Sequence, residues 1–246
     1  MSLLELDGVR KNFGPVQALA GVSFAVAAGE VIGLVGDNGA GKSTLMKTVT
    51  GVHTPDGGSI RFAGMRLEGR EPGEIRALGV EMIYQDLALA RMQDVASNIF
   101  LGREPTRRLF GTPIRLIDRA RIEREAAAMI RRLGARLPSV TSPVGQLSGG
   151  QQQSVAIARA LTFNPKLVIM DEPTAALAVR EVEHVLDLIR ELRRQGIAVI
   201  LISHRLNDVF AVCDRIIALR QGQVVADEAI AATSMNDVVA QIVGAA

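Results

Sequence analysis

The sequence predicts an α/β protein whose mostly parallel sheet is covered by helices on both faces. Three observations indicate this class. Short apolar runs rich in branched residues alternate with amphipathic helical stretches along much of the 246-residue chain. Turns containing glycine or proline separate these runs, and a helical block between residues 94 and 163 interrupts the alternation. We therefore expect one domain over residues 1–246, with a core formed by about 1–93 and 164–246 and a helical subdomain formed by about 94–163.

Five short strands are predicted in the first third of the chain. The first two are expected to be joined through Gly14, Pro15 and Gly21. The third is a continuous apolar run, which is typical of a strand buried on both faces of a sheet. The predicted strands cover residues 3–9, 22–26, 31–35, 59–63 and 80–84.

The last third of the chain repeats the alternation of strand and helix. An apolar run at 167–170 precedes a helical stretch at 179–195, and a second apolar run follows at 197–202. Apolar residues between 209 and 217 continue the pattern, and a late strand is expected at 223–226. Because parallel strands need crossover connections, this order predicts helices on both faces of the sheet.

Composition limits the classes of protein that the sequence fits. The formal net charge of +2 is too small to indicate a nucleic-acid partner, and we expect none. Cys213 is the only cysteine, which excludes an internal disulfide, and it is expected to be a small core residue. No apolar run approaches the roughly 18 residues that span a bilayer, and no N-terminal signal pattern is visible. We therefore expect a soluble cytosolic chain whose membrane association depends on a partner.

One region is strongly basic. Residues 103–136 contain ten arginines and four acidic residues, a local net charge of +6. The simplest interpretation is a solvated helical face, which helices often carry. The alternative is a basic surface near a membrane or an acidic partner.

A glycine-rich segment follows the strand at 31–35 and precedes a helical stretch. Its pattern is G-x-x-x-x-G-K-S, the spacing of a phosphate-binding loop in its expected strand-to-helix context. Glycines let backbone N–H groups face a bound phosphate, and the helix N-terminus adds partial positive charge. Lys42 is expected to reach the β- and γ-phosphates, and the Ser43 hydroxyl to bind Mg²⁺. The predicted phosphate-binding residues are Gly36, Asn38, Gly39, Ala40, Gly41, Lys42, Ser43 and Thr44.

Two consecutive carboxylates end the apolar run at 167–170. Behind a phosphate-binding loop, Asp171 is expected to help hold Mg²⁺, and Glu172 to orient or deprotonate the attacking water. The alternative is an ordinary strand exit into a polar loop, with Pro173 marking the turn.

The segment Leu-Ser-Gly-Gly-Gln at 147–151 precedes a helical run. Ser148 is a suitable N-cap residue, and the paired glycines leave backbone N–H groups uncovered at the helix start. Such a helix start suits an anion. The predicted anion-binding residues are Ser148, Gly149, Gly150 and Gln151.

In order, the phosphate-binding loop, Gln85, the LSGGQ segment, the Asp-Glu pair and His204 resemble the ATP-binding-cassette (ABC) ATPases over nearly the whole chain. The resemblance implies a phosphate-loop NTPase core with an antiparallel β subdomain and a helical subdomain. It also implies an ATPase that binds ATP and Mg²⁺ and works as a head-to-tail homodimer or paired cassette. Each ATP would lie between the phosphate-binding loop of one cassette and the LSGGQ segment of the other.

The resemblance implies three further roles. Gln85 is similar to the glutamine that meets Mg²⁺ and the attacking water, and that connects the site to the helical subdomain. His204 is similar to the switch histidine that contacts the γ-phosphate, which makes it a catalytic candidate beside Lys42 and Glu172. Phe13 takes the place of the aromatic residue that stacks on adenine, although it could be an ordinary core residue.

Residues 84–89 and 98–105 resemble the ATPases of bacterial monosaccharide importers, especially of the ribose, xylose and fructose type. That resemblance implies membrane permease subunits as direct partners and a substrate-binding protein as an indirect one. It places the chain peripherally, on the cytoplasmic face of the bacterial inner membrane. The alternatives are the cassette of an exporter and a soluble ABC ATPase without a transport role.

One departure from the family pattern concerns the loop after Glu172. The family commonly ends this loop in Ser-Ala-Leu-Asp, whereas residues 175–178 here are Ala-Ala-Leu-Ala. Because the loop signals across the pair of cassettes in the family, the missing aspartate at Ala178 puts coupling between the two sites in doubt. Both carboxylates remain, so we expect hydrolysis to survive.

Overall fold

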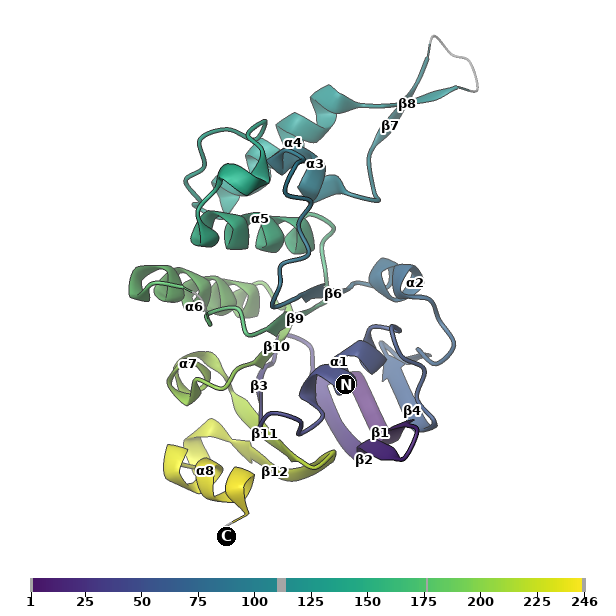
Figure 1. Cartoon of the computed structure of the whole chain (residues 1–246), viewed down its shortest axis with the longest axis vertical. Coiled ribbons are helices and arrows are strands. Elements are labelled where there is room, and N and C mark those ends of the chain that lie inside the picture. The colour runs from purple at the N-terminus through teal and green to yellow at the C-terminus, as the bar shows by residue number, and fades with distance from the viewer. Residues whose placement is uncertain (1, 110–113, 176, 245–246) are drawn as a thin grey trace.

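The computed structural model describes residues 2–109, 114–175 and 177–244. Position 176 of the loop at 175–178 therefore lies outside the described residues. Figure 1 shows a central sheet, a second sheet beside it, and a group of helices at the opposite end from the C-terminus. This arrangement confirms the predicted α/β class with a mostly parallel sheet and an antiparallel sheet. No helix in the described part of the chain combines the length and apolar character needed to cross a bilayer.

The central sheet has six strands, and only the edge strand β12 runs antiparallel to its neighbour. Every residue of β3 and β10 is buried, because helices or the second sheet cover both faces. In spatial order the strands are β12 (Gln223–Ala229), β11 (Arg215–Arg220), β3 (Val31–Val35), β10 (Ala198–Ile202), β9 (Leu167–Asp171) and β6 (Val80–Ile83).

The second sheet is antiparallel and contains the two longest strands. Its order is β2 (Val16–Ala27), β1 (Ser2–Phe13), β4 (Gly57–Phe62) and β5 (Met65–Arg66). The predicted joint at Gly21 is wrong, because Gly21 lies inside β2. Val9 pairs with Val22 but Arg10 pairs with Ala20, so Gly21 is the extra residue of a bulge, with φ at 106°.

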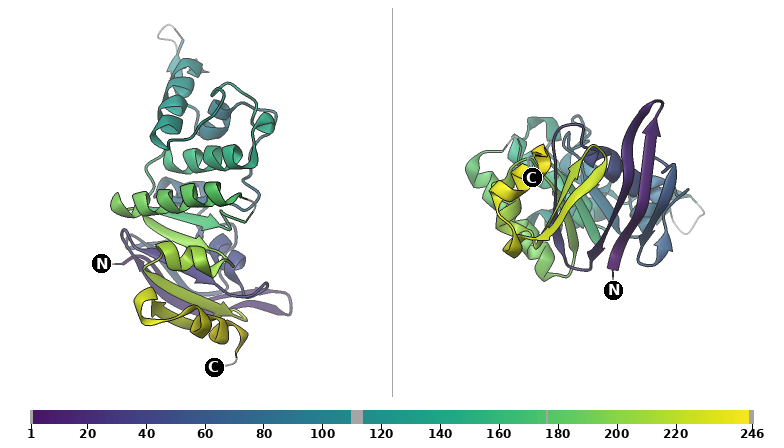
Figure 2. Two further views of the ribbon diagram at one scale, coloured as in Figure 1. Left: turned by 90° about the vertical axis from the view of Figure 1, so that its left-hand side faces the viewer. Right: turned by 90° about the horizontal axis from the view of Figure 1, so that it is seen from below.

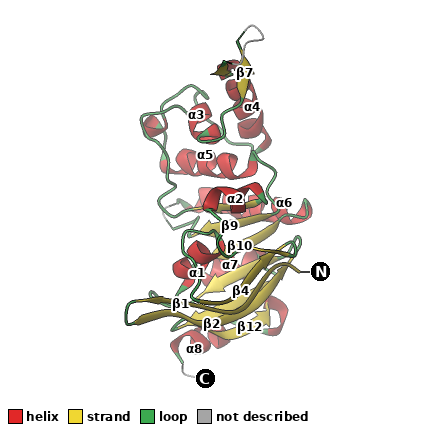
Figure 3. Ribbon diagram, turned by 90° about the vertical axis from the view of Figure 1, so that its right-hand side faces the viewer, coloured by secondary structure: helices red, strands yellow, loops and turns green. Residues whose placement is uncertain are grey.

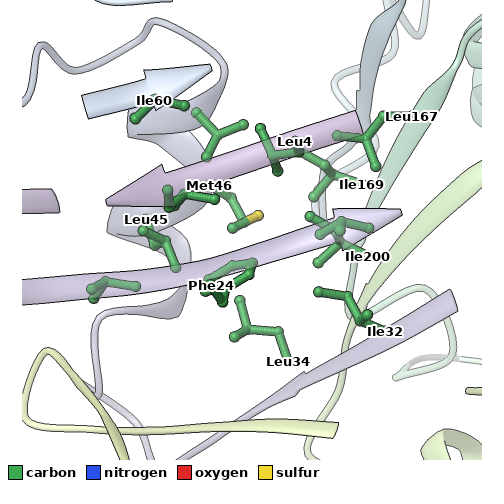
Figure 4. Packing of buried hydrophobic residues seen from close by; sticks show 14 of the residues in the cluster. Leu4, Phe24, Ile32, Leu34, Leu45, Met46, Ile60, Leu167, Ile169 and Ile200 are labelled. Atoms are coloured by element: carbon green, nitrogen blue, oxygen red, sulfur yellow. The ribbon is translucent and has the colours of Figure 1, made fainter. Parts of the chain in front are cut away.

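The space between the two sheets is filled by an aliphatic core around α1 (Lys42–Val49). Leu45 and Met46 of this helix are fully buried against both sheets. Figure 4 shows them in one cluster with Leu4 of the antiparallel sheet and Ile200 of the central sheet. The helix that follows the phosphate-binding loop is thus anchored to both sheets, which fixes the direction in which its first turn points.

Three helices cover the other face of the central sheet: α6 (Val179–Arg194), α7 (Leu206–Val212) and α8 (Met235–Val243). Figure 2 shows them together on one side of the molecule. On α6, buried residues recur every three or four positions from Val182 to Leu192, as expected for an amphipathic helix. Cys213, just after α7, is buried in this layer, as predicted.

A separate core holds α3 (Val95–Phe100), α4 (Arg119–Arg132) and α5 (Gly149–Leu161) together. The helical pattern expected over about 94–163 was predicted to break at 111–113, which lie outside the described residues, and at 137–145, but no strands were predicted beside the first break. A hairpin of β7 (Thr106–Arg108) and β8 (Arg115–Ile117) projects from this group. Its residues carry no apolar repeat of helical period, so nothing in them could bury a helix face against α4.

The remaining elements are short. Helix α2 (Pro72–Ala77) packs on β6, and single 3₁₀ turns occur at Val144–Gln146 and Ile230–Ala232. Helix α8 was not expected from the sequence. It begins at a capping box in which the Ser234 hydroxyl accepts the Asp237 N–H and the Asp237 carboxylate accepts the Ser234 N–H.

Helix α6 begins at Ala178, which has extended backbone torsions but no side chain able to cap the helix. The substitution Ala178→Asp should supply the missing acceptor and raise the free energy of unfolding by about 1 kcal/mol. For a chain of this length that is a rise in Tm of roughly 2–4 °C, measurable by calorimetry. Ala178→Asn is the matched control, because it caps without a charge and should recover most of the gain. An unchanged Tm in both variants would contradict this account of the helix start.

Candidate functional site

The phosphate-binding loop connects β3 to α1 along a path that depends on glycine. Gly36, Gly39 and Gly41 have φ values of 147°, 82° and 106°, a region that side-chain-bearing residues rarely adopt. Gly41 directly precedes the first residue of α1, so the loop ends at a helix N-terminus. Backbone N–H groups and the positive end of the helix therefore converge on one place, as an anion site requires.

The loop is held from outside by two neighbouring backbone segments. The N–H of Gly222, in the turn between β11 and β12, donates to the Ala40 carbonyl at 3.0 Å, and the N–H of Ala20 donates to the Gly222 carbonyl at 2.8 Å. A Cβ atom at Gly41 or Gly222 would lie 2.7 Å from the Ala18 carbonyl oxygen. The strand β2 therefore passes so close that only glycine fits at both positions.

Lys42 is folded back onto its own loop. Its Nζ donates to the carbonyl oxygens of Gly36 at 2.6 Å and Asp37 at 2.9 Å. Burial lowers the pKa of the ammonium, and the charges of Glu172 and Asp171 oppose that shift. The partly buried ammonium contacts only neutral carbonyls directly, and the carboxylates lie farther away. A phosphate can therefore replace these carbonyls as the partner of the charge.

The two predicted carboxylates stand where β9 ends. Burial raises the pKa of Asp171, the charge of Glu172 adds to the rise, and Lys42 opposes it. Glu172 has φ at 50°, a left-handed conformation that costs a residue with a side chain of order 1–3 kcal/mol. Its N–H donates to the Ile202 carbonyl at 3.0 Å, which holds this conformation against β10.

His204 lies beside Glu172, a contact that was not predicted, whereas its contact with a γ-phosphate stays a prediction. Its Nδ1 is 2.8 Å from Glu172 Oε2, and its backbone N–H donates to Glu172 Oε1 at 3.1 Å. The imidazole itself is 66% exposed, whereas the Glu172 side chain is largely buried. His204 can therefore hold the carboxylate from one side and still reach a ligand arriving from solvent.

Lys42, Asp171 and Glu172 line a cavity of about 450 Å³ together with the phosphate-binding loop. Its predicted lining residues are Asn38, Gly39, Ala40, Gly41, Lys42, Ser43, Thr44, Gln85, Asp171 and Glu172. Five residues were not predicted: Val16, Gln17, Ala18, Ile202 and Gln221. They come from β2, β10 and the β11–β12 turn, which only the sheet topology brings together. The only local hint of these residues was the glycine of the β11–β12 turn, Gly222. Its close contact with Ala18 becomes visible only in the fold.

Three predicted residues of this half of the site lie outside this lining: Gly36, Phe13 and His204, which contacts the lining residue Glu172. Gly36 supports the loop from behind, where a Cβ atom would lie 2.1 Å from the Leu219 carbonyl oxygen. Phe13 ends β1, and its ring is 44% exposed and makes an edge contact with the His53 ring at 5.2 Å between centroids. Stacking of adenine on Phe13 stays a prediction.

Three oxygen-bearing side chains in the cavity fit a magnesium ion. Ser43, Gln85 and Asp171 supply a hydroxyl, an amide oxygen and a carboxylate, and Mg²⁺ prefers few protein oxygens together with phosphate and water. Burial and then the charge of Glu172 raise the pKa of Asp171, and a divalent cation beside this carboxylate would favour its ionised form. In the described residues no cluster of three histidine, cysteine or acidic side chains offers a metal site of another kind.

The LSGGQ segment lies elsewhere in the chain, at the start of α5. The Ser148 hydroxyl accepts the Gln151 N–H at 3.3 Å, and the Gln151 amide oxygen accepts the Ser148 N–H at 3.0 Å. In the described part of the chain, the N–H groups of Gly149 and Gly150 have no hydrogen-bond acceptor. Gly150 and Gln151 line a different cavity, of about 350 Å³, so this half of the predicted site is not brought to the phosphate-binding loop.

The sequence matches the family model described as ABC transporter over residues 19–175, a span that contains the phosphate-binding loop, the LSGGQ segment and the Asp-Glu pair. The chain belongs to the ABC transporter family. This confirms the family predicted from the motifs.

Curated relatives of this ABC chain are named as sugar importers. It is 46% identical over 239 residues to a ribose import ATP-binding protein of Chromobacterium violaceum, covering 97% of this chain and 46% of that one. A xylose/arabinose import ATP-binding protein of Sulfolobus acidocaldarius is 44% identical, over 91% of this chain and 86% of that one. A fructose import ATP-binding protein of Rhizobium meliloti is 45% identical, over 90% and 86%. The chain thus spans about half the length of the ribose-type relative and most of the length of the other two.

Solved ABC cassettes have the same fold. The ADP conformation of one ATP-binding cassette is 30% identical, with a TM-score of 0.81 over 99% of each chain. A dimeric cassette in a post-hydrolysis state, bound to ADP and Pi, is 26% identical, with a TM-score of 0.79 over 92% of this chain and 98% of that one.

Two glycine substitutions in the phosphate-binding loop distinguish the cost of backbone strain from the cost of a steric contact with β2. Gly39→Ala places its Cβ in open space, so it should lower the free energy of unfolding by roughly 1–2 kcal/mol through its positive φ alone. Gly41→Ala adds the contact with the Ala18 carbonyl and should cost about 2–4 kcal/mol. Urea unfolding of both variants measures the difference. Equal losses would contradict the role given to β2.

Proposed function

We propose that this chain is the ATP-hydrolysing subunit of an importer that moves a monosaccharide through partner membrane subunits. The observation that carries the proposal is the cavity in which Lys42, Asp171 and Glu172 meet at the phosphate-binding loop. Phosphoryl transfer to water needs three groups of this kind: a cation for the phosphates, a carboxylate for Mg²⁺ and a second carboxylate for the attacking water.

Each side chain has a role that follows from its position. Lys42 exchanges the carbonyls of Gly36 and Asp37 for the β- and γ-phosphates. Ser43, Gln85 and Asp171 would hold Mg²⁺, which neutralises charge that develops on the phosphates. Glu172 orients the attacking water and accepts its proton as the bond from the γ-phosphorus to the bridging oxygen breaks. His204 keeps Glu172 in place and contacts the γ-phosphate.

The site is completed by a second cassette. Gly149 and Gly150 present unpaired N–H groups at the start of α5, a suitable place for the γ-phosphate of a nucleotide bound by another subunit. Because the two halves line different cavities in one chain, a head-to-tail homodimer or paired cassette joins them. The dimeric state of the related cassette with ADP and Pi supports this arrangement.

The partner membrane subunits are proposed to dock in a groove between the central sheet and the helical group. This cavity, of about 170 Å³, is lined by residues of α2, β6, α3 and α5. Tyr84 lines the groove, and the next residue, Gln85, lines the cavity at the phosphate-binding loop. A shift of this segment would therefore change the shape of both cavities. Docking there places the chain peripherally on the cytoplasmic face of the inner membrane, with the substrate-binding protein as an indirect partner.

The substrate class rests on the relatives, whose names include ribose, xylose/arabinose and fructose import. The test is to reconstitute the chain with its membrane subunits in proteoliposomes and add binding protein with and without sugar. Stimulation of ATP hydrolysis by sugar-loaded binding protein is expected. Hydrolysis that ignores the loaded binding protein would contradict the importer and favour an exporter or a cassette without a transport role.

Glu172→Gln should retain ATP binding and lower kcat at least 100-fold, since an amide cannot accept a proton from water. With ATP and Mg²⁺ the variant should accumulate as a dimer, measured by light scattering after size exclusion. Glu183→Gln is the matched control: Glu183 lies exposed on α6, and the variant should behave as the wild type. A monomeric Glu172→Gln variant with normal turnover would contradict the catalytic role.

A further inference from the structure

The β7–β8 hairpin is exposed along its whole paired length. All six residues of its two strands are exposed, three of them are arginines, and none is acidic. The strands pair Thr106 with Ile117, Arg107 with Leu116, and Arg108 with Arg115. The hairpin therefore presents basic and aliphatic side chains together to the surroundings.

The arginines of the hairpin have no partner of opposite charge in the described part of the chain. Arg108 and Arg115 stand directly opposite each other, an arrangement that repels. The flanking carboxylates are engaged elsewhere: Glu104 accepts the Gly102 N–H at 3.1 Å, and Asp118 accepts the Arg121 N–H at 3.1 Å at the start of α4. A bound anion would relieve the repulsion.

Other arginines of the same basic stretch are paired. Arg103 contacts Glu81, Arg119 contacts Asp94 and Glu123, and Arg121 contacts Glu125. The interpretation of residues 103–136 as a solvated helical face fits α4, where Arg119 and Arg121 are ion-paired and the other arginines have no acidic partner among the described residues. It leaves out the hairpin, whose charge is uncompensated and whose aliphatic neighbours are exposed, with Leu116 at 41% and Ile117 at 58%.

The hairpin lies on the side of the molecule that carries the docking groove. Figures 1 and 3 both show β7 on the same side as α2, whose residues line that groove. If membrane subunits dock there, as proposed above, the projecting hairpin faces the bilayer around them. This step alone rests on the proposed function.

We propose that the β7–β8 hairpin binds anionic phospholipid headgroups at the membrane surface. Guanidinium groups form paired hydrogen bonds with phosphate, and Leu116 and Ile117 can enter the boundary between headgroups and acyl chains. Both faces of the ribbon carry an arginine and an aliphatic residue, because Arg107 and Leu116 share one face while Arg108, Arg115 and Ile117 share the other. A ribbon that lies within the headgroup layer has phosphates on both sides, so anionic lipid can contact both faces. A single acidic loop of a protein would contact only one face.

The test uses the purified full-length chain and sedimented vesicles. Binding is expected to vesicles of phosphatidylcholine mixed with phosphatidylglycerol, to weaken with added salt, and to be negligible for phosphatidylcholine alone. The double variant Arg108→Gln/Arg115→Gln should lower the partition coefficient roughly 30-fold, since each arginine near an anionic surface contributes about fivefold. Leu116→Asn should lower it by a further, salt-independent factor.

The matched control is Arg61→Gln/Arg66→Gln. These arginines also face each other across a hairpin, of β4 and β5, but Arg61 has Glu5 opposite it on β1. The control removes the same charge and should change vesicle binding less than twofold.

Three outcomes would overturn the proposal. The first is absence of binding by the wild type, and the second is an equal loss in both double variants, which would indicate general electrostatic attraction. The third is intact vesicle binding in the hairpin variant with lost stimulation by membrane subunits, which would indicate a protein contact. Thermal unfolding checks that each variant is folded. Because vesicle binding needs no nucleotide, its failure would leave the proposed ATPase function untouched, and the reverse also holds.

Discussion

The close passage of β2 over the phosphate-binding loop is the constraint on which the rest of the site depends. The Ala18 carbonyl lies where a side chain at Gly41 or Gly222 would have to go. Backbone hydrogen bonds from Gly222 to Ala40 and from Ala20 to Gly222 then connect the loop to both sheets. The antiparallel sheet therefore forms one wall of the cavity at the phosphate-binding loop, and the shape of the loop depends on residues distant in sequence.

A second constraint is electrostatic. The cavity holds a cation whose pKa is lowered by burial and a carboxylate whose pKa is raised by burial and by a neighbouring charge. A magnesium ion and a phosphate would each bring the opposite charge and reverse these shifts. The left-handed backbone of Glu172 adds stored strain at the same place, which β10 holds through the Ile202 carbonyl. The charges of the cavity are thus complementary to a magnesium ion and a phosphate. Without these ligands, the buried charges and the strained backbone lower the stability of the fold.

The fold class and most residues that line the cavity at the phosphate-binding loop could be predicted from the sequence, because their signals are local. The apolar run of β3, the glycine spacing after it and the carboxylates at the end of β9 each depend on a few adjacent residues. Features that depend on pairing between distant segments were missed. Gly21 was expected to be a joint because a bulge is visible only from the register of β1, and Gln17 or Gln221 have no local signature at all.

The same distinction applies to the helical group. Its core was visible as a helical pattern, but the β7–β8 hairpin was not, since short exposed strands bury nothing and leave no periodic trace. The LSGGQ segment shows a further limit. Its anion-binding chemistry could be predicted from the helix start, and its place opposite the phosphate-binding loop of another cassette came from the family resemblance, whereas the separate cavities of the two segments within one chain are seen only in the structure. That separation supports the proposal that the complete site lies between two chains.

Mixing two inactive variants tests this shared site most directly. Lys42→Ala removes the phosphate contact of one half, and Ser148→Arg blocks the start of α5 in the other. Each variant alone should hydrolyse no ATP. In a head-to-tail heterodimer one of the two composite sites is intact, so the mixture is predicted to regain a substantial part of wild-type hydrolysis. A mixture as inactive as its components would contradict the account, as would a Ser148→Arg variant that hydrolyses ATP normally by itself.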